Sequence, residues 1–215
     1  MASTAILAQG TSFAIAGTPG AALTITAISK AVGAVCSCTT PPAVGTVVVF
    51  SAATGMPEIV NRFGIVSAIV AATSFTVNID SSGFATAATA ATGLPQTWTT
   101  VANVHDYTGF DGVSAEIDVT NLQSLAKEYS PGLEDFGQFA MNVDVDNTDL
   151  GQIAMRAAKT SQSKTYFKLI MRNLTVRVIY GFVKKFSEAG AVDGVVKSSV
   201  DVRISSRPNF SEVIN

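Results

Sequence analysis

The sequence predicts a mainly β protein with one α-helix. Short segments rich in valine, isoleucine, threonine and phenylalanine recur along the 215 residues, with glycine, proline or serine between them. One segment, 149–158, instead has apolar residues at helical spacing. Hydrophobic residues make up 47% of the chain and charged residues 14%, so the chain can bury a core and is not disordered through charge. The sequence has no run of about 18 apolar residues, which excludes a predicted transmembrane helix.

The first half predicts a compact β unit. The expected strands are residues 23–29, 44–52, 63–70 and 74–79, with turn-forming proline, glycine and serine between and after them. Residues 85–93 then repeat alanine and threonine and end shortly before Pro95, which is typical of a linker. We therefore expect a domain boundary near residue 92.

The next expected strands alternate between apolar and polar residues. In 113–120 the apolar residues occupy every second position, which predicts a half-buried strand, and 139–145 has the same pattern. The polar stretch 121–138 lies between them, and Ser130, Pro131 and Gly132 predict a turn within it. Connections longer than about 12 residues tend to be functional or disordered, so this segment is a candidate functional loop.

A helix and three strands complete the chain. Asp149 precedes Gln152 by three residues, which is the spacing of a helix-capping pair. The predicted apolar stripe of the helix consists of Leu150, Ile153, Ala154, Ala157 and Ala158. Residues 165–172, 174–187 and 195–205 are the expected strands, and Asp193 with Gly194 predicts a hairpin turn between the last two.

Charge is distributed unevenly although the net charge is only −2. Residues 106–149 carry ten acidic side chains and one lysine, whereas 150–215 carry eleven basic and four acidic side chains. Two interpretations stay open: the two segments pair within one fold, or opposed poles of the subunit stack head to tail. The low net charge argues against an electrostatic nucleic-acid binder.

Sites for catalysis or metal binding are poorly supported. Cys36 and Cys38 lack the two further ligands that zinc needs, so we expect reduced structural cysteines. The acidic run 144–149 lacks the glycine and glutamate of a calcium loop and fits the N-terminus of a helix instead. His105 is the single histidine, and the pair Glu116 and Asp118 has no aromatic cleft to suggest a glycosidase. We expect no enzyme activity, no cofactor and no metal.

The second half contains an ordered series of segments: EYSPGLEDFG (128–137), GQIAMRAA (151–158), YFKL (166–169), GFV (181–183) and SSVDVRISSRP (198–208). This series resembles the major tail tube protein of long, non-contractile-tailed bacteriophages. Residues 3–18 resemble the first strand of that family, and WTTVANV (98–104) its continuation. The resemblance implies a β-sandwich or barrel with a flanking helix, formed by residues 1–19 and 93–215.

The resemblance also implies an assembly. Six subunits would close a ring, and rings would stack into a hollow tube in the virion tail, assembled in the host cytoplasm. The implied partners are other copies of the chain, a tape-measure protein and double-stranded DNA in the lumen, and tail terminator and tail-tip proteins, with no membrane.

Two groups of site residues follow from this reading. We expect the 121–137 segment to order when a neighbouring subunit docks, with inter-subunit contacts from Lys127, Glu128, Tyr129, Pro131, Gly132, Leu133, Glu134 and Asp135. The polar face of the 113–120 strand, Ser114, Glu116 and Asp118, is the candidate lumen wall, where acidic groups would repel DNA phosphates. An ordinary solvated outer face is the alternative for these three residues.

Residues 20–92 are expected to be a small all-β domain inserted into the tube fold, followed by the Ala/Thr linker. VGTVVVF (44–50), GMPEIVNR (55–62) and DSSGF (80–84) resemble a small β domain of phage virion proteins. An alternative function is therefore a virion decoration or adhesion protein whose β domain binds a host surface or a carbohydrate.

Overall fold

The computed structural model describes residues 8–206 and 208–211. Two segments of the expected fold lie partly outside these residues: positions 3–7 of the first strand, and Arg207 of the last matched segment. The described residues form three β-sheets and a single α-helix, which confirms the prediction of a mainly β fold with one helix. None of the helices in this part of the chain has the length and hydropathy needed to cross a bilayer.

The chain divides into two compact units. The first consists of residues up to Thr100 together with Lys168–Val178 and Asn209 onward, and the second consists of Val101–Phe167 and Ile179–Pro208. Strands β9 (Trp98–Val101), β14 (Thr165–Ile170) and β15 (Val176–Ala189) contribute residues to both units.

The main feature of the first unit is a seven-stranded antiparallel sheet, which we call the small barrel. Its strands, in the order β2-β8-β5-β6-β7-β4-β3, are β2 (Leu23–Ile25), β8 (Ala90–Pro95), β5 (Val47–Thr54), β6 (Phe63–Val70), β7 (Ser74–Asp80), β4 (Val32–Ser37) and β3 (Ala27–Ile28). Ile28 and Ala88 exchange two backbone hydrogen bonds of 3.0 and 3.1 Å, so β3 lies beside the segment that leads into β8. The sheet thereby closes on itself around its own core.

The interior of the small barrel is almost wholly apolar. Phe50, Phe75 and Ile25 are among its fully buried side chains, and a short 3-10 helix, η1 (Pro57–Ile59), adds Ile59. Cys36 and Cys38 lie buried in the same core without a disulfide between them, as expected of structural cysteines. Burial, with a smaller effect of Cys38, raises the pKa of the Cys36 thiol to about 12, so it is a poor nucleophile near neutral pH.

The prediction of a linker over residues 85–93 is wrong for residues 90–93, because they belong to strand β8. Ala91 and Gly93 of this strand face inward, and a Cβ on Gly93 would come within 2.9 Å of Val48 Cγ1. Small residues allow β8 to pack tightly against the core. The alanine, threonine and glycine of residues 90–93 are therefore explained by close packing.

Around the small barrel, the first unit adds β1 (Ser12–Ala16) between β14 and β9, and β17 (Asn209–Ser211), which pairs with β15. The chain enters and leaves the barrel at adjacent points. The Gly20 N–H donates to Pro95 O at 2.8 Å, and the Gly17 N–H donates to Thr97 O at 3.0 Å.

The second unit is built on an antiparallel sheet in the order β10-β13-β16-β15. Its strands are β10 (Val104–Gly109), β13 (Gln138–Asp144), β16 (Lys197–Ile204) and the later part of β15. Phe139 lies opposite Val202, and Met141 lies opposite Val200, and all four side chains are buried. The predicted turn at 193–194 is confirmed, since the Gly194 N–H donates to Ala191 O between β15 and β16.

Helix α1 (Leu150–Ser161) begins as the sequence predicts but is rotated relative to the predicted stripe. The Asp149 side chain accepts a hydrogen bond from the Gln152 N–H at 2.8 Å. The predicted burial of Leu150 and Ile153 is wrong, since they are 69% and 43% exposed. The buried residues are Gly151, Gln152, Met155 and Ala158.

Gln152 explains this rotation. Its Nε2 donates to Ala102 O and Asp144 O, and its Oε1 accepts from the Asp146 N–H at 3.0 Å. The fully buried amide therefore satisfies three backbone groups that would otherwise lack partners, which keeps this face of the helix inward.

Candidate functional site

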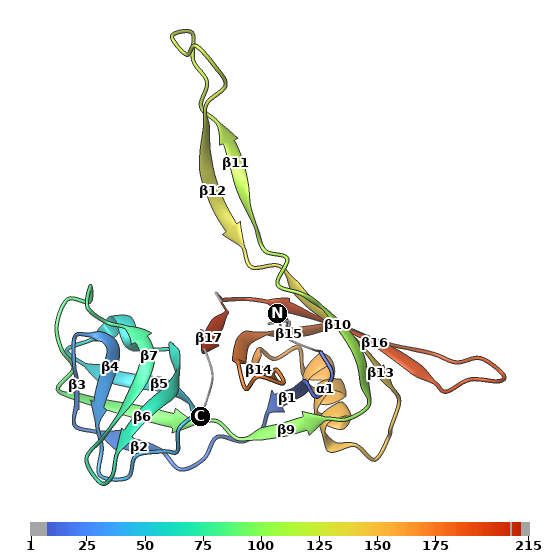
Figure 1. The fold of residues 1–215 in the computed structure, drawn as a ribbon, viewed down its shortest axis with the longest axis horizontal. Helices are drawn as coiled ribbons and strands as arrows, with labels where there is room; N and C mark the ends of the chain where they lie inside the picture. Colours follow the sequence, from blue (N-terminus) through green and yellow to red (C-terminus); the bar gives the residue numbers. More distant parts are fainter. Residues whose placement is uncertain (1–7, 207, 212–215) are drawn as a thin grey trace, which may run out of the picture. The chain divides into compact units, whose positions relative to one another are not determined.

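The second unit carries a two-stranded antiparallel hairpin, which we call the ribbon. It comprises β11 (Val113–Asp118), β12 (Tyr129–Asp135) and the tip, residues 119–128, between them. Within the described residues no further strand pairs with it, and Figure 1 shows it extending away from β10 and β13 of the same unit.

Both groups of predicted site residues lie on the ribbon. Ser114, Glu116 and Asp118 belong to β11, Lys127 and Glu128 to the tip, and Tyr129 to Asp135 to β12. The register places members of the two groups opposite one another: Ser114 with Glu134, Glu116 with Pro131 and Asp118 with Tyr129. The structure thus brings together residues to which the sequence analysis gave separate roles.

Two sequence expectations for this segment are wrong. The 113–120 strand is not half-buried, because every residue of β11 is exposed in the single chain. The predicted turn at Ser130, Pro131 and Gly132 is instead part of β12. Proline is accommodated because β12 is an edge strand and because the pairing register shifts between Ser114 and Glu116, beside Pro131.

The two faces of the ribbon differ in chemistry. Residues opposite one another on antiparallel strands project to the same face. One face, which we call the acidic face, therefore carries Ser114, Glu116, Asp118, Tyr129, Pro131 and Glu134. The other, the apolar face, carries Val113, Ala115 and Ile117 with Ser130, Gly132 and Asp135.

Nothing in the described part of the unit covers the apolar face. Val113 is 69% exposed and Ile117 52% exposed. A Cβ on Gly132 would come within 3.2 Å of Ala115 Cβ and 3.3 Å of Ile117 Cγ1, so glycine leaves these apolar side chains open. A two-stranded hairpin is marginally stable alone in water, and one with an uncovered apolar face is suited to packing against another surface.

The tip is shaped by local side-chain hydrogen bonds. Asp118 Oδ1 accepts from the Thr120 N–H at 2.9 Å, and Thr120 Oγ1 accepts from the Glu128 N–H at 3.0 Å. Hydrogen bonds from the Thr120 side chain and backbone hold the pKa of Asp118 below its ordinary value. The ordered tip presents Leu122 and Leu125, both fully exposed.

The base of the ribbon is fixed to the sheet by carboxylates and glycines. Asp111 Oδ1 accepts from the Gln138 N–H at 2.7 Å, and Asp135 accepts from the Gly137 N–H at 2.9 Å and pairs with the Arg203 guanidinium. The Gly137 hydrogen bond, followed by Arg203, holds the pKa of Asp135 below its ordinary value. Gly137 has φ +74°, a conformation that favours glycine.

The single histidine of the chain contacts one carboxylate. His105 Nε2 lies 2.6 Å from Asp144 Oδ2, with its side chain half exposed on the surface of the β10-β13 pair. Asp106 accepts a hydrogen bond from Asn142 instead of contacting His105. In the residues that the structure describes, no group of three or more His, Cys, Asp or Glu side chains is placed to hold a metal ion.

The sequence analysis did not predict that Leu122 and Leu125 are exposed at the tip, or that Val113 and Ile117 are exposed on the apolar face. The two leucines had a usable signal, because they are the large apolar residues of an otherwise polar segment. The exposure of Val113 and Ile117 had none, since alternation shows which side chains share a face and not what covers that face.

Comparisons with known proteins give a structural likeness but no sequence match. No protein-family model matches the chain. No curated protein matches it. Among solved structures, the chain is similar to one described as the tail of an empty GTA particle with C6 symmetry, with 14% sequence identity and a TM-score of 0.46, over 54% of this chain and 87% of that chain.

Proposed function

We propose that the protein is a structural subunit that assembles with copies of itself into stacked rings, forming the hollow tail tube of a phage-like particle. The observation that carries the proposal is the ribbon, an ordered hairpin whose apolar face and leucine tip have no cover in the described part of its own unit. The ordered series of segments between residues 113 and 208 that resembles tail tube proteins supports the same function.

Seven large apolar side chains of the ribbon are exposed in the single chain. Val113, Ile117, Val119, Leu122, Leu125, Tyr129 and Leu133 are between 47% and 107% exposed. Monomeric soluble proteins seldom leave such patches open, and burying them stabilises a complex by about 25 cal/mol per Å² of apolar area. A neighbouring subunit is the partner that a ring or tube supplies to every ribbon.

The geometry favours a repeating assembly over an isolated dimer. An element that projects from one side of a subunit and docks on a different surface of the next makes a heterologous contact, which closes into a ring or continues as a filament. We propose six subunits per ring on the resemblance. Tyr129 to Asp135, with Lys127 and Glu128, belong to the inter-subunit surface in this proposal.

The resemblance also supplies the proposed contents of the tube. DNA passes through the lumen without sequence-specific contacts, a tape-measure protein occupies it during assembly, and terminator and tip proteins close the two ends. The subunit acts in the virion tail as a wall and performs no chemistry on what passes through.

We further propose that residues 20–92 are a β domain inserted into a tube fold made of residues 1–19 and 93–215. The small barrel has its own closed core, and the hydrogen bond from Gly20 to Pro95 brings the two connections together. Both properties are those of a unit that can be added to an existing fold without breaking its core.

Removal of the ribbon tests the function. Residues 113–135 are replaced by an Asn-Gly turn, which is feasible because a Cβ on Gly112 would lie 3.2 Å from the Phe136 carbonyl carbon. We expect the wild-type protein to form regular hollow tubes in negative-stain electron microscopy when it is concentrated. The variant should stay monomeric while keeping a cooperative thermal unfolding transition.

Two outcomes would contradict the proposal. Tubes from the variant would show that the ribbon is not the assembly element. A wild-type protein that stays monomeric even when seeded with preformed tail fragments would exclude a tube subunit.

A further inference from the structure

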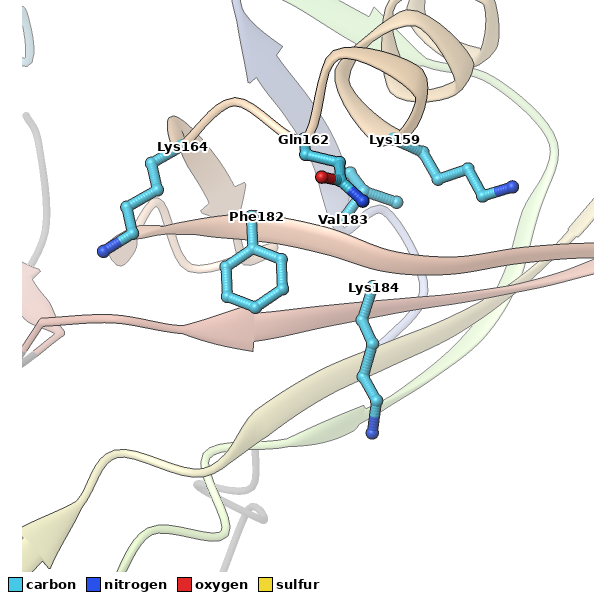
Figure 2. Close-up of a pocket in the computed structure, with 6 residues that line it drawn as sticks. All are labelled: Lys159, Gln162, Lys164, Phe182, Val183 and Lys184. Atoms are coloured by element: carbon cyan, nitrogen blue, oxygen red, sulfur yellow. The ribbon is translucent and has the colours of Figure 1, made fainter.

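The second unit has a hollow of about 400 Å³ between the end of α1 and β15, which we call the lysine hollow. Its lining residues are Lys159, Gln162, Lys164, Phe182, Val183 and Lys184. Figure 2 shows the Phe182 ring between the side chains of Lys164 and Lys184, with Lys159 and Gln162 at the end of the helix. One aromatic side chain and three lysines thus contribute to the lining of the same hollow.

The charge of this hollow is not balanced locally. None of its lining residues is acidic, and no ion pair to any of the three lysines is present in the described part of the chain. The helix dipole favours Lys159 in the last turn of α1, but it does not explain Lys164 or Lys184. A surface that gathers cations around an apolar centre is suited to an acidic partner with an apolar centre of its own.

The acidic face of the ribbon has this composition. Tyr129 and Pro131 lie across from Asp118 and Glu116, and Glu134 follows on the same face. Three carboxylates therefore accompany an aromatic ring and a proline, as three ammonium groups accompany Phe182. The acidic face of the ribbon and the lysine hollow carry opposite charges, and both contain apolar side chains.

We propose that the acidic face of the ribbon of one subunit docks into the lysine hollow of a neighbouring copy. This inference rests on the proposed assembly and names the surface that receives the ribbon. The partner is a second copy because, within the described residues, no ion pair joins the two surfaces of one chain and the ribbon extends away from α1 in Figure 1.

The proposal gives Glu116 and Asp118 a different role from the lumen wall suggested by the sequence alone. The two roles predict different behaviour. A docking residue changes assembly when it is altered, whereas a residue of the lumen wall leaves assembly unchanged and alters only the surface that DNA meets.

A charge-swap experiment tests the docking. One variant carries Lys164→Glu with Lys184→Glu, and a second carries Glu116→Lys with Asp118→Lys. Each should raise the protein concentration needed for tube assembly about tenfold or more, because like charges then face one another. The two variants mixed should assemble together, because each ribbon then meets a hollow of opposite charge on the other variant, and a chain carrying all four changes should also regain assembly.

Lys184→Gln and Lys185→Gln form a matched pair of controls. Both lysines are exposed neighbours on β15, but only Lys184 lines the hollow. Lys184→Gln should weaken assembly, and Lys185→Gln should leave it near the wild-type concentration. Equal effects of the two would overturn the proposal.

A cross-link gives a readout that does not depend on charge. Asp118→Cys combined with Lys184→Cys should yield intermolecular disulfide-linked oligomers under mild oxidation during assembly. The native Cys36 and Cys38 are buried and should not contribute. Absence of linked oligomers from assembled tubes would overturn the proposal.

The outcomes separate this inference from the proposed function. Failure of the wild-type protein to assemble contradicts the function itself. Tubes from Lys164→Glu/Lys184→Glu at the wild-type concentration leave the function standing and overturn the docking. If that variant assembles normally but loses binding to a short DNA duplex in fluorescence anisotropy, the hollow receives phosphates and the docking is again overturned.

Discussion

Leu122 and Leu125 show most directly how single residues prepare this chain for assembly. Both are fully exposed, yet the backbone around them is held by the Asn121 side chain, whose Oδ1 accepts from the Gln123 N–H, and by the Ser124 N–H bond to Asn121 O. An ordered tip loses little conformational entropy on docking, so more of the apolar burial appears as affinity.

Replacing these leucines should separate folding from assembly. Leu122→Ser with Leu125→Ser should change the free energy of unfolding by less than about 0.5 kcal/mol, because the side chains contact little in the monomer. Tube formation should be lost or need much higher concentrations, as followed by light scattering and electron microscopy. Val32→Ser, at a residue 81% exposed on the small barrel, is the control and should assemble normally.

Gln152 shows how much an element can depend on a single polar side chain. A helix-capping pair was predictable from the spacing of Asp149 and Gln152 alone, and the Asp149 cap is present. The additional role of the Gln152 side chain was not predictable, because Ala102 lies 50 residues away in sequence. Long-range polar contacts of this kind leave no local periodicity to detect.

The same hydrogen bonds determine how much the free energy of unfolding should fall when the Gln152 side-chain amide is removed. Gln152→Leu should destabilise the protein by about 2–4 kcal/mol, because the Asp146 N–H and the carbonyls of Ala102 and Asp144 lose their partner inside the fold. Urea unfolding measures the difference. Ile153→Ala, at the exposed neighbour, should change stability by less than about 0.5 kcal/mol.

At the base of the ribbon, Asp135 makes the anchoring dependent on pH. Its pKa is lower in the folded chain than in the unfolded chain, so its ionised form favours the folded arrangement above the ordinary aspartate pKa of about 3.9. That contribution is lost as the pH falls through the folded-state pKa. We expect the protection factor of the Gly137 amide, its exchange rate corrected for the intrinsic pH dependence, to fall below about pH 4, as measured by hydrogen exchange.

Asp135→Asn should remove most of this pH dependence, since the amide can accept from Gly137 but cannot pair ionically with Arg203. Asp193→Asn, in the turn of the β15-β16 hairpin, is the control and should keep the wild-type profile. An unchanged profile in Asp135→Asn would assign the effect to other carboxylates.

The elements of the chain were predictable to different degrees. Strands such as β6 and β7 follow directly from their β-branched residues, and β16 lies within the expected strand 195–205. Residues 129–135 were expected as loop because Pro131 and Gly132 are turn residues, and their pairing depends on a bulge opposite Ala115 that no local pattern specifies. Of the candidate site, the sequence indicated the residues, but their common location on one hairpin required the structure.

At the scale of the whole molecule, we expect tube assembly to continue when the small barrel is removed. Excision of residues 21–94, with Gly20 joined to Pro95 through a short glycine linker, keeps the hydrogen-bonded positions at the connection close together. The remaining chain should fold cooperatively and still form tubes, because the ribbon and the lysine hollow belong to the second unit.

Calorimetry and electron microscopy check this expectation. Loss of cooperative unfolding would show that the barrel belongs to the core of the protein and is not an insertion. Intact particles that no longer bind host cells would instead indicate that the barrel is a recognition domain.

The ribbon also determines what the two ends of an assembly would look like. In a proposed assembly whose ribbons dock between successive layers, every interior ribbon is occupied, while the last layer at one end shows bare ribbons and the last layer at the other end shows empty hollows. The polymer is therefore polar, and its ends differ in charge and in apolar exposure. A protein that caps the end with bare ribbons has to present lysines and an apolar pocket. A protein that binds the end with empty hollows has to present carboxylates and an aromatic ring. Neither protein could therefore replace the other.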